Sequence, residues 1–225
     1  MLHVLAIEMT RVKICGIRSM ADMQLAVRCG ADAIGVLVGQ LHSSPDFIPA
    51  SLANEICVGT PPFVTTVLVT HITDPDAVRA LAESVHSSAV QLHSDLDLPV
   101  LDELRRALSP RKVIAKITVE DSSAIERARE LDHQGDAILL DSINRNTGQV
   151  GGTGIPHDWE ISSQIVQQVS TPVILAGGLS PANIRKAIRQ VQPWAVDVNS
   201  GVRNNTGFKD GNLIRAFIEG SKMLD

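Results

Sequence analysis

Short runs of apolar, mostly β-branched residues alternate along this chain with longer polar stretches that carry apolar residues at helical spacing. Eight of the runs predict strands, at residues 12–15, 33–38, 64–69, 89–92, 113–117, 137–140, 173–175 and 195–198. Stretches between them predict helices, and most begin with a Ser or Asp that can cap a helix; examples are 19–29, 74–84, 97–108, 121–131 and 180–190. The pattern therefore predicts eight βα units.

Eight such units within about 215 residues, with no low-complexity linker, predict a single-domain (β/α)8 barrel over residues 11–225. The alternative is a doubly wound sheet, which would have fewer strands and a Gly-x-Gly-x-x-Gly turn after the first one. Here the first strand ends in Cys15-Gly16 and the glycine-rich turns come late in the chain, which favours the barrel. Residues 1–10 precede the first clear strand signal and are predicted to form an N-terminal extension.

Composition and charge indicate in which environment this barrel works and which classes of partner it lacks. Hydrophobic residues make up 44% of the 225 positions and aromatic residues only 3%, which suits apolar parallel strands covered by helices. The net charge of −5 provides no basic field for nucleic acid, and no apolar run approaches the roughly 18 to 20 residues that span a bilayer. Three cysteines without a C-x-x-C pair indicate neither a disulfide framework nor a zinc knuckle. We therefore expect a soluble cytoplasmic protein with no nucleic-acid or membrane partner. The sequence leaves its oligomeric state open between a monomer and a homodimer.

Three glycine-rich loops follow the last three predicted strands. They contain Gly154, the pair Gly177 and Gly178, and the pair Ser200 and Gly201. Barrels commonly hold a phosphate at the last two of these loops, because glycine lets backbone amides approach the phosphate oxygens. We therefore predict that these five residues bind a phosphate, against the alternative that the loops are only tight turns. Ser180-Pro181 predicts an N-cap and the first residue of the following helix.

Cys15 and Asp141 end two predicted strands and are the candidate catalytic residues. Cys15 can be a nucleophile, a proton-transfer base or a packing residue, and Asp141 can be an acid or the cap of a loop. Lys13 would favour the Cys15 thiolate if strand alternation points both side chains inward. His93 follows the fourth strand and can line the same mouth. The histidines and acidic residues have no metal-ligand spacing, so we expect no catalytic metal.

Ten short motifs, taken in order, resemble the phosphoribosylanthranilate isomerase family. The motifs are KICG at 13–16, GADAIG at 30–35, PF at 62–63, VQLH at 90–93, LLDS at 139–142, GGTG at 151–154, DW at 158–159, LAGGL at 175–179, VDVNSGV at 196–202 and KD at 209–210. The resemblance implies a cofactor-independent barrel that performs an Amadori rearrangement, converting a phosphorylated aminoaldose into an aminoketose in tryptophan biosynthesis. It also implies that Cys15 is the general base and Asp141 the general acid, acting on a small phosphorylated sugar.

Four positions depart from the family pattern. After the second strand, the family usually carries an arginine that faces the anthranilate end of the substrate, and this chain has Asp46. His157 replaces Phe, Asn199 replaces a small residue, and Arg203 replaces Glu. A misplaced anion beside an anionic substrate costs binding energy, so either another group compensates for Asp46 or the substrate lacks that carboxylate. Arg18 and Arg145 are candidate compensators, and Arg18, Asp46, Lys13 and His93 are candidate substrate contacts.

The departures leave three functional hypotheses. The first is a phosphoribosylanthranilate isomerase with Cys15 as base and Asp141 as acid. The second is a related isomerase or lyase that acts on a different phosphorylated sugar or amine, which Asp46 favours. The third is a catalytically silent barrel that binds a sugar phosphate, and the presence of both Cys15 and Asp141 counts against it.

Overall fold

The computed structural model of the protein describes residues 9–39, 44–144, 149–150 and 157–222. Residues 1–8 of the predicted N-terminal extension lie outside the described residues, as do Gly154 and Arg145. Met9 and Thr10 lead directly into the first strand, where Thr10 is buried and Met9 is exposed.

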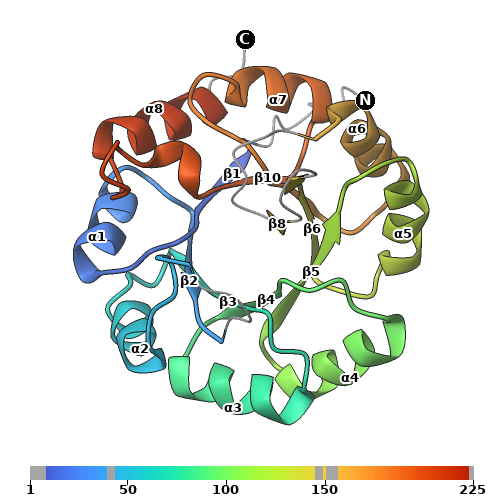
Figure 1. Ribbon diagram of the computed structural model, residues 1–225, viewed down its shortest axis with the longest axis horizontal. Coiled ribbons are helices and arrows are strands. Elements are labelled where there is room, and N and C mark those ends of the chain that lie inside the picture. Colours follow the sequence, from blue (N-terminus) through green and yellow to red (C-terminus); the bar gives the residue numbers. More distant parts are fainter. Residues whose placement is uncertain (1–8, 40–43, 145–148, 151–156, 223–225) are drawn as a thin grey trace, which may run out of the picture.

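Eight parallel strands close into a barrel, which confirms the predicted (β/α)8 architecture (Figure 1). Their order around the barrel is β1-β10-β9-β6-β5-β4-β3-β2, and β1 pairs with both β10 and β2. The strands are β1 (Arg11–Ile14), β2 (Ala33–Leu37), β3 (Thr65–Thr70), β4 (Ala89–Leu92), β5 (Lys112–Thr118), β6 (Ala137–Asp141), β9 (Val173–Leu175) and β10 (Ala195–Val198). Each matches a predicted run to within a residue or two. Because all eight are parallel, their carboxyl ends meet at one mouth of the barrel.

Helices follow the strands in turn and form a ring around the barrel (Figure 1). They are α1 (Met20–Arg28), α2 (Ala50–Val58), α3 (Pro75–Val85), α4 (Leu98–Leu108), α5 (Ser123–Leu131), α6 (Trp159–Gln168), α7 (Ile184–Val191) and α8 (Gly211–Lys222). Within the described residues, none of these helices is long and apolar enough to cross a membrane.

Two separate cores follow from the alternation of side chains along each strand. Val12 and Ile14 of β1 face outward into the large core between strands and helices. Cys15 belongs to the smaller core inside the barrel, with Leu139 of β6. Since side chains two positions apart share a face, Leu139 predicts that Asp141 also points into the barrel. The alternation along the strands thus places Cys15 and Asp141 inside the barrel, at the mouth where the strands end.

Helix starts follow the predicted caps in part. The Ser19 side chain accepts a hydrogen bond from the Asp22 amide, and Asp74 accepts one from Ala77, as N-caps do. The prediction for Ser180-Pro181 is wrong, because α7 begins three residues later, after Asn183. The Asn183 side chain accepts from the Ser180 amide at 2.8 Å, so a turn precedes the helix there.

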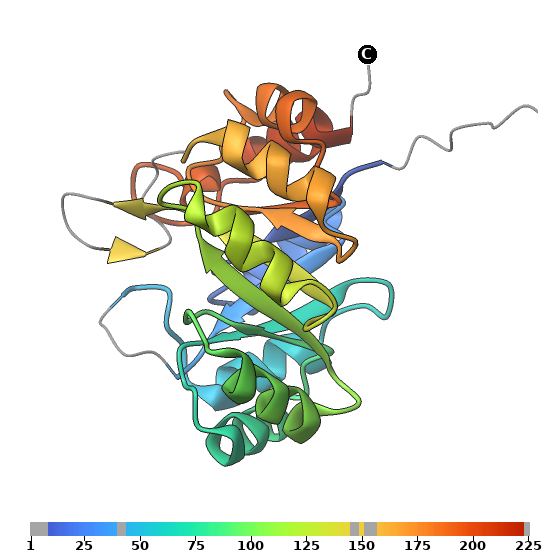
Figure 2. The same cartoon turned by 90° about the vertical axis from the view of Figure 1, so that its right-hand side faces the viewer.

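A short antiparallel ribbon interrupts the sixth βα unit. It consists of β7 (Ile143–Asn144) and β8 (Gln149–Val150). Figure 2 shows the ribbon projecting beyond the barrel at the same end as residues 44–49, which lead into α2. The ribbon begins two residues after Asp141, so it stands beside the mouth at the end of β6.

Candidate active site

A cavity opens at the carboxyl ends of the strands. The residues that line it lie at or just beyond the carboxyl ends of the strands. They include Cys15, Asp46, His71, Gln91, His93, Asp141, Gly177, Gly178, Asp197, Asn199, Ser200 and Arg203. Cys15 follows β1 and Asp141 ends β6, so the two candidate catalytic residues reach one cavity from separate parts of the barrel wall.

Cys15 is a buried thiol at the edge of this cavity, only 6% exposed. Burial raises the pKa of Cys15 to about 11, although the neighbouring Lys13 ammonium acts in the opposite direction. The thiol is therefore protonated in the free protein at neutral pH, and Lys13 does not make it a thiolate there. Lys13 does point inward beside it, as the alternation predicts: a side chain on Gly35 would touch both Cys15 and Lys13.

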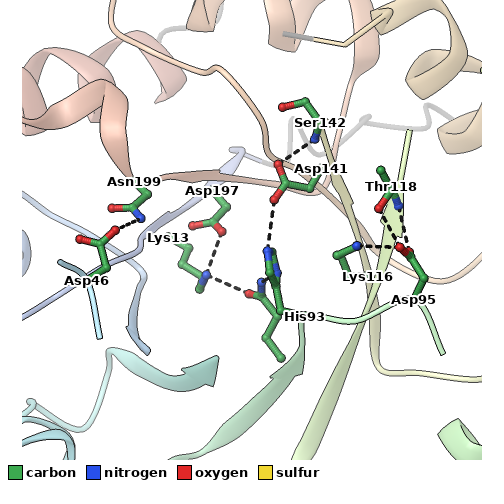
Figure 3. Close-up of polar contacts among 11 residues, drawn as sticks. Lys13, Asp46, His93, Asp95, Lys116, Thr118, Asp141, Ser142, Asp197 and Asn199 are labelled. Carbon is green, nitrogen blue, oxygen red and sulfur yellow. Dashed lines mark hydrogen bonds and ion pairs between the residues drawn. The ribbon is translucent and has the colours of Figure 1, made fainter. Parts of the chain in front are cut away.

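Lys13 is held by two buried partners. Its Nζ lies 2.8 Å from Oδ2 of Asp197 and donates a hydrogen bond to Gln91 at 3.0 Å (Figure 3). Asp197 was not among the predicted site residues, although it stands two positions after Ala195, which faces the inner core. Period-two alternation along β10 is the signal that could have found it.

Asp141 is a buried carboxyl whose surroundings favour the neutral acid. Burial raises its pKa to about 6, while the hydrogen bond from the Ser142 amide to Oδ1, at 2.8 Å, acts in the opposite direction. Nε2 of His93 lies 3.5 Å from Oδ2 of Asp141 (Figure 3), and Nδ1 of His93 contacts Gln91 at 3.0 Å. A carboxyl with a pKa near neutrality can both hold and release a proton, as a general acid must.

The predicted phosphate loops pack closely around this cavity. Gly177 and Gly178 have φ of +79° and +64°, a left-handed conformation that favours glycine. A side chain on Gly177 would come within 2.6 Å of Ser142, and one on Gly201 within 2.0 Å of the Leu179 carbonyl oxygen. The loop after β9 therefore packs closely against Ser142 and against Gly201, and Gly177, Gly178 and Ser200 line the cavity. Gly154, the fifth predicted residue, lies outside the described residues.

Three of the four departures from the family pattern touch one another. Asp46 forms an ion pair with Arg203. Nδ2 of Asn199 donates to Asp46 at 2.8 Å (Figure 3). Nη2 of Arg203 also donates to Oδ1 of Asn199 at 2.6 Å. The fourth, His157, lies elsewhere: its Nε2 contacts Ser162 of α6 at 2.6 Å. The compensating cation for Asp46 is thus Arg203, a residue that the sequence does not indicate for that role.

Arg18 does not make the contact expected of a cation that compensates for the charge of Asp46. Its guanidinium donates to the carbonyl oxygens of Pro45, at 3.3 Å, and Gly207, at 2.7 Å. It also lies over the Phe208 ring, 5.1 Å from the ring centre. Arg145 lies outside the described residues. Among the residues that the structure describes, no three His, Cys, Asp or Glu side chains are grouped to hold a metal ion.

Comparisons with known proteins agree on one family. The family model described as N-(5'-phosphoribosyl)anthranilate (PRA) isomerase matches residues 12–220. The chain is 41% identical over 212 residues to N-(5'-phosphoribosyl)anthranilate isomerase 2 of Methanosarcina mazei, covering 94% of each chain. It matches the structure of phosphoribosyl anthranilate isomerase from Thermotoga maritima with a TM-score of 0.82 and 36% identity, over 95% of this chain and 99% of that one. A phosphoribosyl anthranilate isomerase in complex with reduced 1-(o-carboxyphenylamino)-1-deoxyribulose 5-phosphate matches with a TM-score of 0.80 and 34% identity, over 95% and 99%.

Proposed function

The chain belongs to the N-(5'-phosphoribosyl)anthranilate isomerase family, and on this premise we propose that Asp141 is its general acid and Cys15 its general base. The protein is an isomerase of the aldose–ketose type in tryptophan biosynthesis. The single observation that carries the proposal is that a buried thiol and a buried carboxyl, from β1 and β6, line the same cavity.

In the first step, Asp141 gives its proton to the ring oxygen of the phosphoribosyl group. The C1–O bond breaks, and the lone pair of the anthranilate nitrogen forms a C=N bond, which leaves an iminium cation and a free hydroxyl. The burial that raises the pKa of Asp141 to about 6 supports this role, because a fraction of the carboxyl stays protonated at neutral pH.

In the second step, the Cys15 thiolate removes the proton from C2. The electron pair of that C–H bond forms a C1–C2 double bond and neutralises the iminium, which yields an enolamine that tautomerises to the ketone. Because the pKa of Cys15 is about 11, the thiolate is scarce in the free protein. The reacting form is the minor one in which the single proton of the pair is on Asp141, and Lys13, with the positive charge of the iminium, favours the thiolate of that form.

The phosphate of the substrate would bind at the loops after β9 and β10. Gly177, Gly178 and Ser200 line the cavity, and Gly201 packs directly against Leu179. Backbone amides in such glycine-rich loops can donate to phosphate oxygens without help from side-chain cations. We extend this assignment to Gly154 from its sequence motif.

The alternative of a different phosphorylated substrate rested on the negative charge of Asp46. Arg203 offsets that charge, so the cavity does not present an unpaired anion at this position. A silent binding barrel would have no use for a proton donor and a proton acceptor in one cavity. The anthranilate substrate is therefore the better supported of the three hypotheses.

A cytoplasmic location and a small phosphorylated sugar as partner complete the proposal. A base that must act as a thiolate needs a reducing compartment, since oxidation would remove it. Residues 11–225 would form the catalytic barrel, and residues 1–10 would be an extension without a catalytic role.

The test is an assay with freshly generated N-(5'-phosphoribosyl)anthranilate, run beside complementation of an isomerase-deficient tryptophan auxotroph. We expect turnover in the assay and growth without tryptophan. Retained binding of sugar phosphates with neither turnover nor growth would support the alternative substrate and overturn the proposal.

A further inference from the structure

One cationic side chain of the Lys or Arg type reaches the described part of the cavity wall. Asp46, Asp141 and Asp197 line it, and Arg203 is the single Lys or Arg among its described lining residues. Three lysines lie nearby without lining the cavity. Lys13 is paired with Asp197 and Lys116 of β5 with Asp95 at 2.9 Å (Figure 3), and Lys209 donates to Asn199. An anionic group that enters the cavity therefore meets the Arg203 guanidinium.

The contacts of Arg203 leave part of its guanidinium unused. Nη2 makes both described contacts, to Asp46 and to Asn199. Neither contact involves Nη1 or Nε, which carry three further N–H groups. The side chain is 17% exposed, so a carboxylate bound there would be largely shielded from water. Charge-assisted hydrogen bonds are stronger under such shielding.

Asp46 offers the complementary feature, an acceptor without a donor. Its Oδ2 is occupied by Arg203 and Asn199, whereas Oδ1 is buried and has no hydrogen-bond partner within the described part of the chain. A buried carboxylate oxygen that lacks a donor carries an unmet desolvation cost, which a ligand N–H would relieve.

We infer that Arg203 binds the carboxylate of the anthranilate group, and that Asp46 holds Arg203 in place and accepts the N–H of the substrate amine through Oδ1. This inference rests on the proposed function. In N-(5'-phosphoribosyl)anthranilate the carboxylate and the amine are on adjacent ring carbons, so an acceptor for one and a donor for the other must lie side by side. The Asp46–Arg203 pair has this arrangement.

The position of the pair relative to Cys15 fits the reaction. Asn199, which contacts both members, lies against Gly16, where an added Cβ would be 2.3 Å from Asn199 Oδ1. The pair is therefore next to the end of β1, near the base that acts on C2. The amine nitrogen is two bonds from C2 and becomes positive when the ring opens, so the Asp46 carboxylate would stabilise the iminium.

Asn199 and Lys209 are positioning residues for this pair. Lys209 Nζ donates to the backbone oxygen of Asn199 at 2.8 Å and to its Oδ1 at 3.0 Å. Oδ1 of Asn199 thus accepts from two cations while Nδ2 donates to Asp46. Burial, with Arg203 nearby, lowers the pKa of Lys209 to about 8. A serine or alanine at position 199 could not make these three contacts.

The test compares two probes that differ only in the carboxylate. They are reduced 1-(o-carboxyphenylamino)-1-deoxyribulose 5-phosphate and its reduced phenylamino counterpart, whose Kd values are measured by calorimetry. We expect the unmodified protein to prefer the carboxylated probe by about tenfold or more. Arg203→Gln should reduce this ratio to near one, while the Kd of the phenylamino probe changes less than threefold. A ratio that survives in Arg203→Gln would overturn the inference.

Arg18→Gln is the matched control, because Arg18 contacts the same loops but turns to the carbonyls of Pro45 and Gly207. It should keep the ratio. If both variants lost the preference for the carboxylated probe equally, the preference would depend on the conformation of these loops and not on the Arg203 guanidinium.

The role of Asp46 has its own readout. Asp46→Asn can still accept from Arg203 through its amide oxygen but removes the charge that favours the iminium, so kcat should fall at least tenfold while the carboxylate preference persists. An unchanged kcat would restrict Asp46 to a structural role. If the unmodified protein binds neither probe and does not turn over the substrate, the proposed function fails; if it does both and only the ratio is insensitive to Arg203, the inference alone fails.

Discussion

Nζ of Lys13 lies 2.8 Å from Oδ2 of Asp197, and both side chains are almost wholly buried inside the barrel beside Cys15. A pair of opposite charges in this position keeps the interior neutral below the catalytic residues. Removal of one partner would leave the other charge buried and unpaired, which is far more costly than the loss of a surface contact.

We therefore expect Lys13→Met to lower the free energy of unfolding by roughly 3 to 5 kcal/mol. The matched control is Lys112→Met, which breaks the Lys112–Asp136 pair at the same 2.8 Å distance but with a lysine side chain that is 72% exposed. That control should lose about 1 kcal/mol or less. Urea unfolding of both variants at pH 7 measures the difference, and equal losses would contradict the account of the Lys13 pair.

Asp141→Asn should stabilise the fold at neutral pH while removing the proposed acid. In the fold the carboxyl holds its proton up to about pH 6, whereas its ordinary pKa is 3.8, so stability falls as the pH rises between these values. At pH 7 the buried carboxylate costs roughly 3 kcal/mol. Thermal unfolding should show a higher Tm for Asp141→Asn at pH 7 and little difference near pH 4. The same difference at both pH values would indicate a cause other than the carboxyl charge.

The pH dependence of kcat/KM should report the acid–base pair. Below about pH 6, Asp141 and Cys15 are both protonated, so the thiolate is lost and kcat/KM should fall about tenfold per pH unit. Between about pH 6 and 11 the pair carries one proton, and kcat/KM should be nearly flat. In Asp141→Asn the residual rate should instead rise with pH across this range. A limb near pH 6 that persists in the variant would belong to the substrate phosphate.

Gly177→Ala should weaken binding of the phosphate-bearing substrate. A Cβ at this position meets the Ser142 backbone nitrogen at 2.8 Å, in addition to the strain of φ +79°. We expect KM to rise about tenfold or more, because the loop that would hold the phosphate must shift. Gly207→Ala shares the strain, with φ +81°, but has open space around the new Cβ. It should lose about 1 kcal/mol of stability and keep its KM. Equal changes in KM would assign the effect to backbone strain.

Much of the fold and part of the site follow from local patterns. Alternation along the strands predicts that Cys15 shares the inward face of Lys13, and that Asp141 shares the inward face of Leu139. The turn before α7 was missed since Ser180-Pro181 has the local signature of a helix start, whereas the bonds of Asn183 decide where the helix begins.

The cluster of Asp46, Asn199 and Arg203 could not be predicted from local sequence. Asn199 and Asp46 are 153 positions apart in the chain. They come together because β1 pairs with both β10, which precedes Asn199, and β2, which precedes Asp46. Nothing in the sequence indicates that the positive charge gained at Arg203 pairs with the negative charge gained at Asp46. The raised pKa of Cys15 was missed for a related reason, because the burial that causes it comes from strands distant in the chain.

The most direct measurement of the central claim is the kcat of Cys15→Ala and of Asp141→Asn on freshly generated N-(5'-phosphoribosyl)anthranilate, each beside the Kd of the reduced product analogue. A general base or acid contributes roughly a hundredfold to ten-thousandfold, so both variants should lose at least a hundredfold in kcat and still bind the analogue. Near-normal turnover by either variant would contradict the assignment of Cys15 and Asp141 as the proton-transfer pair.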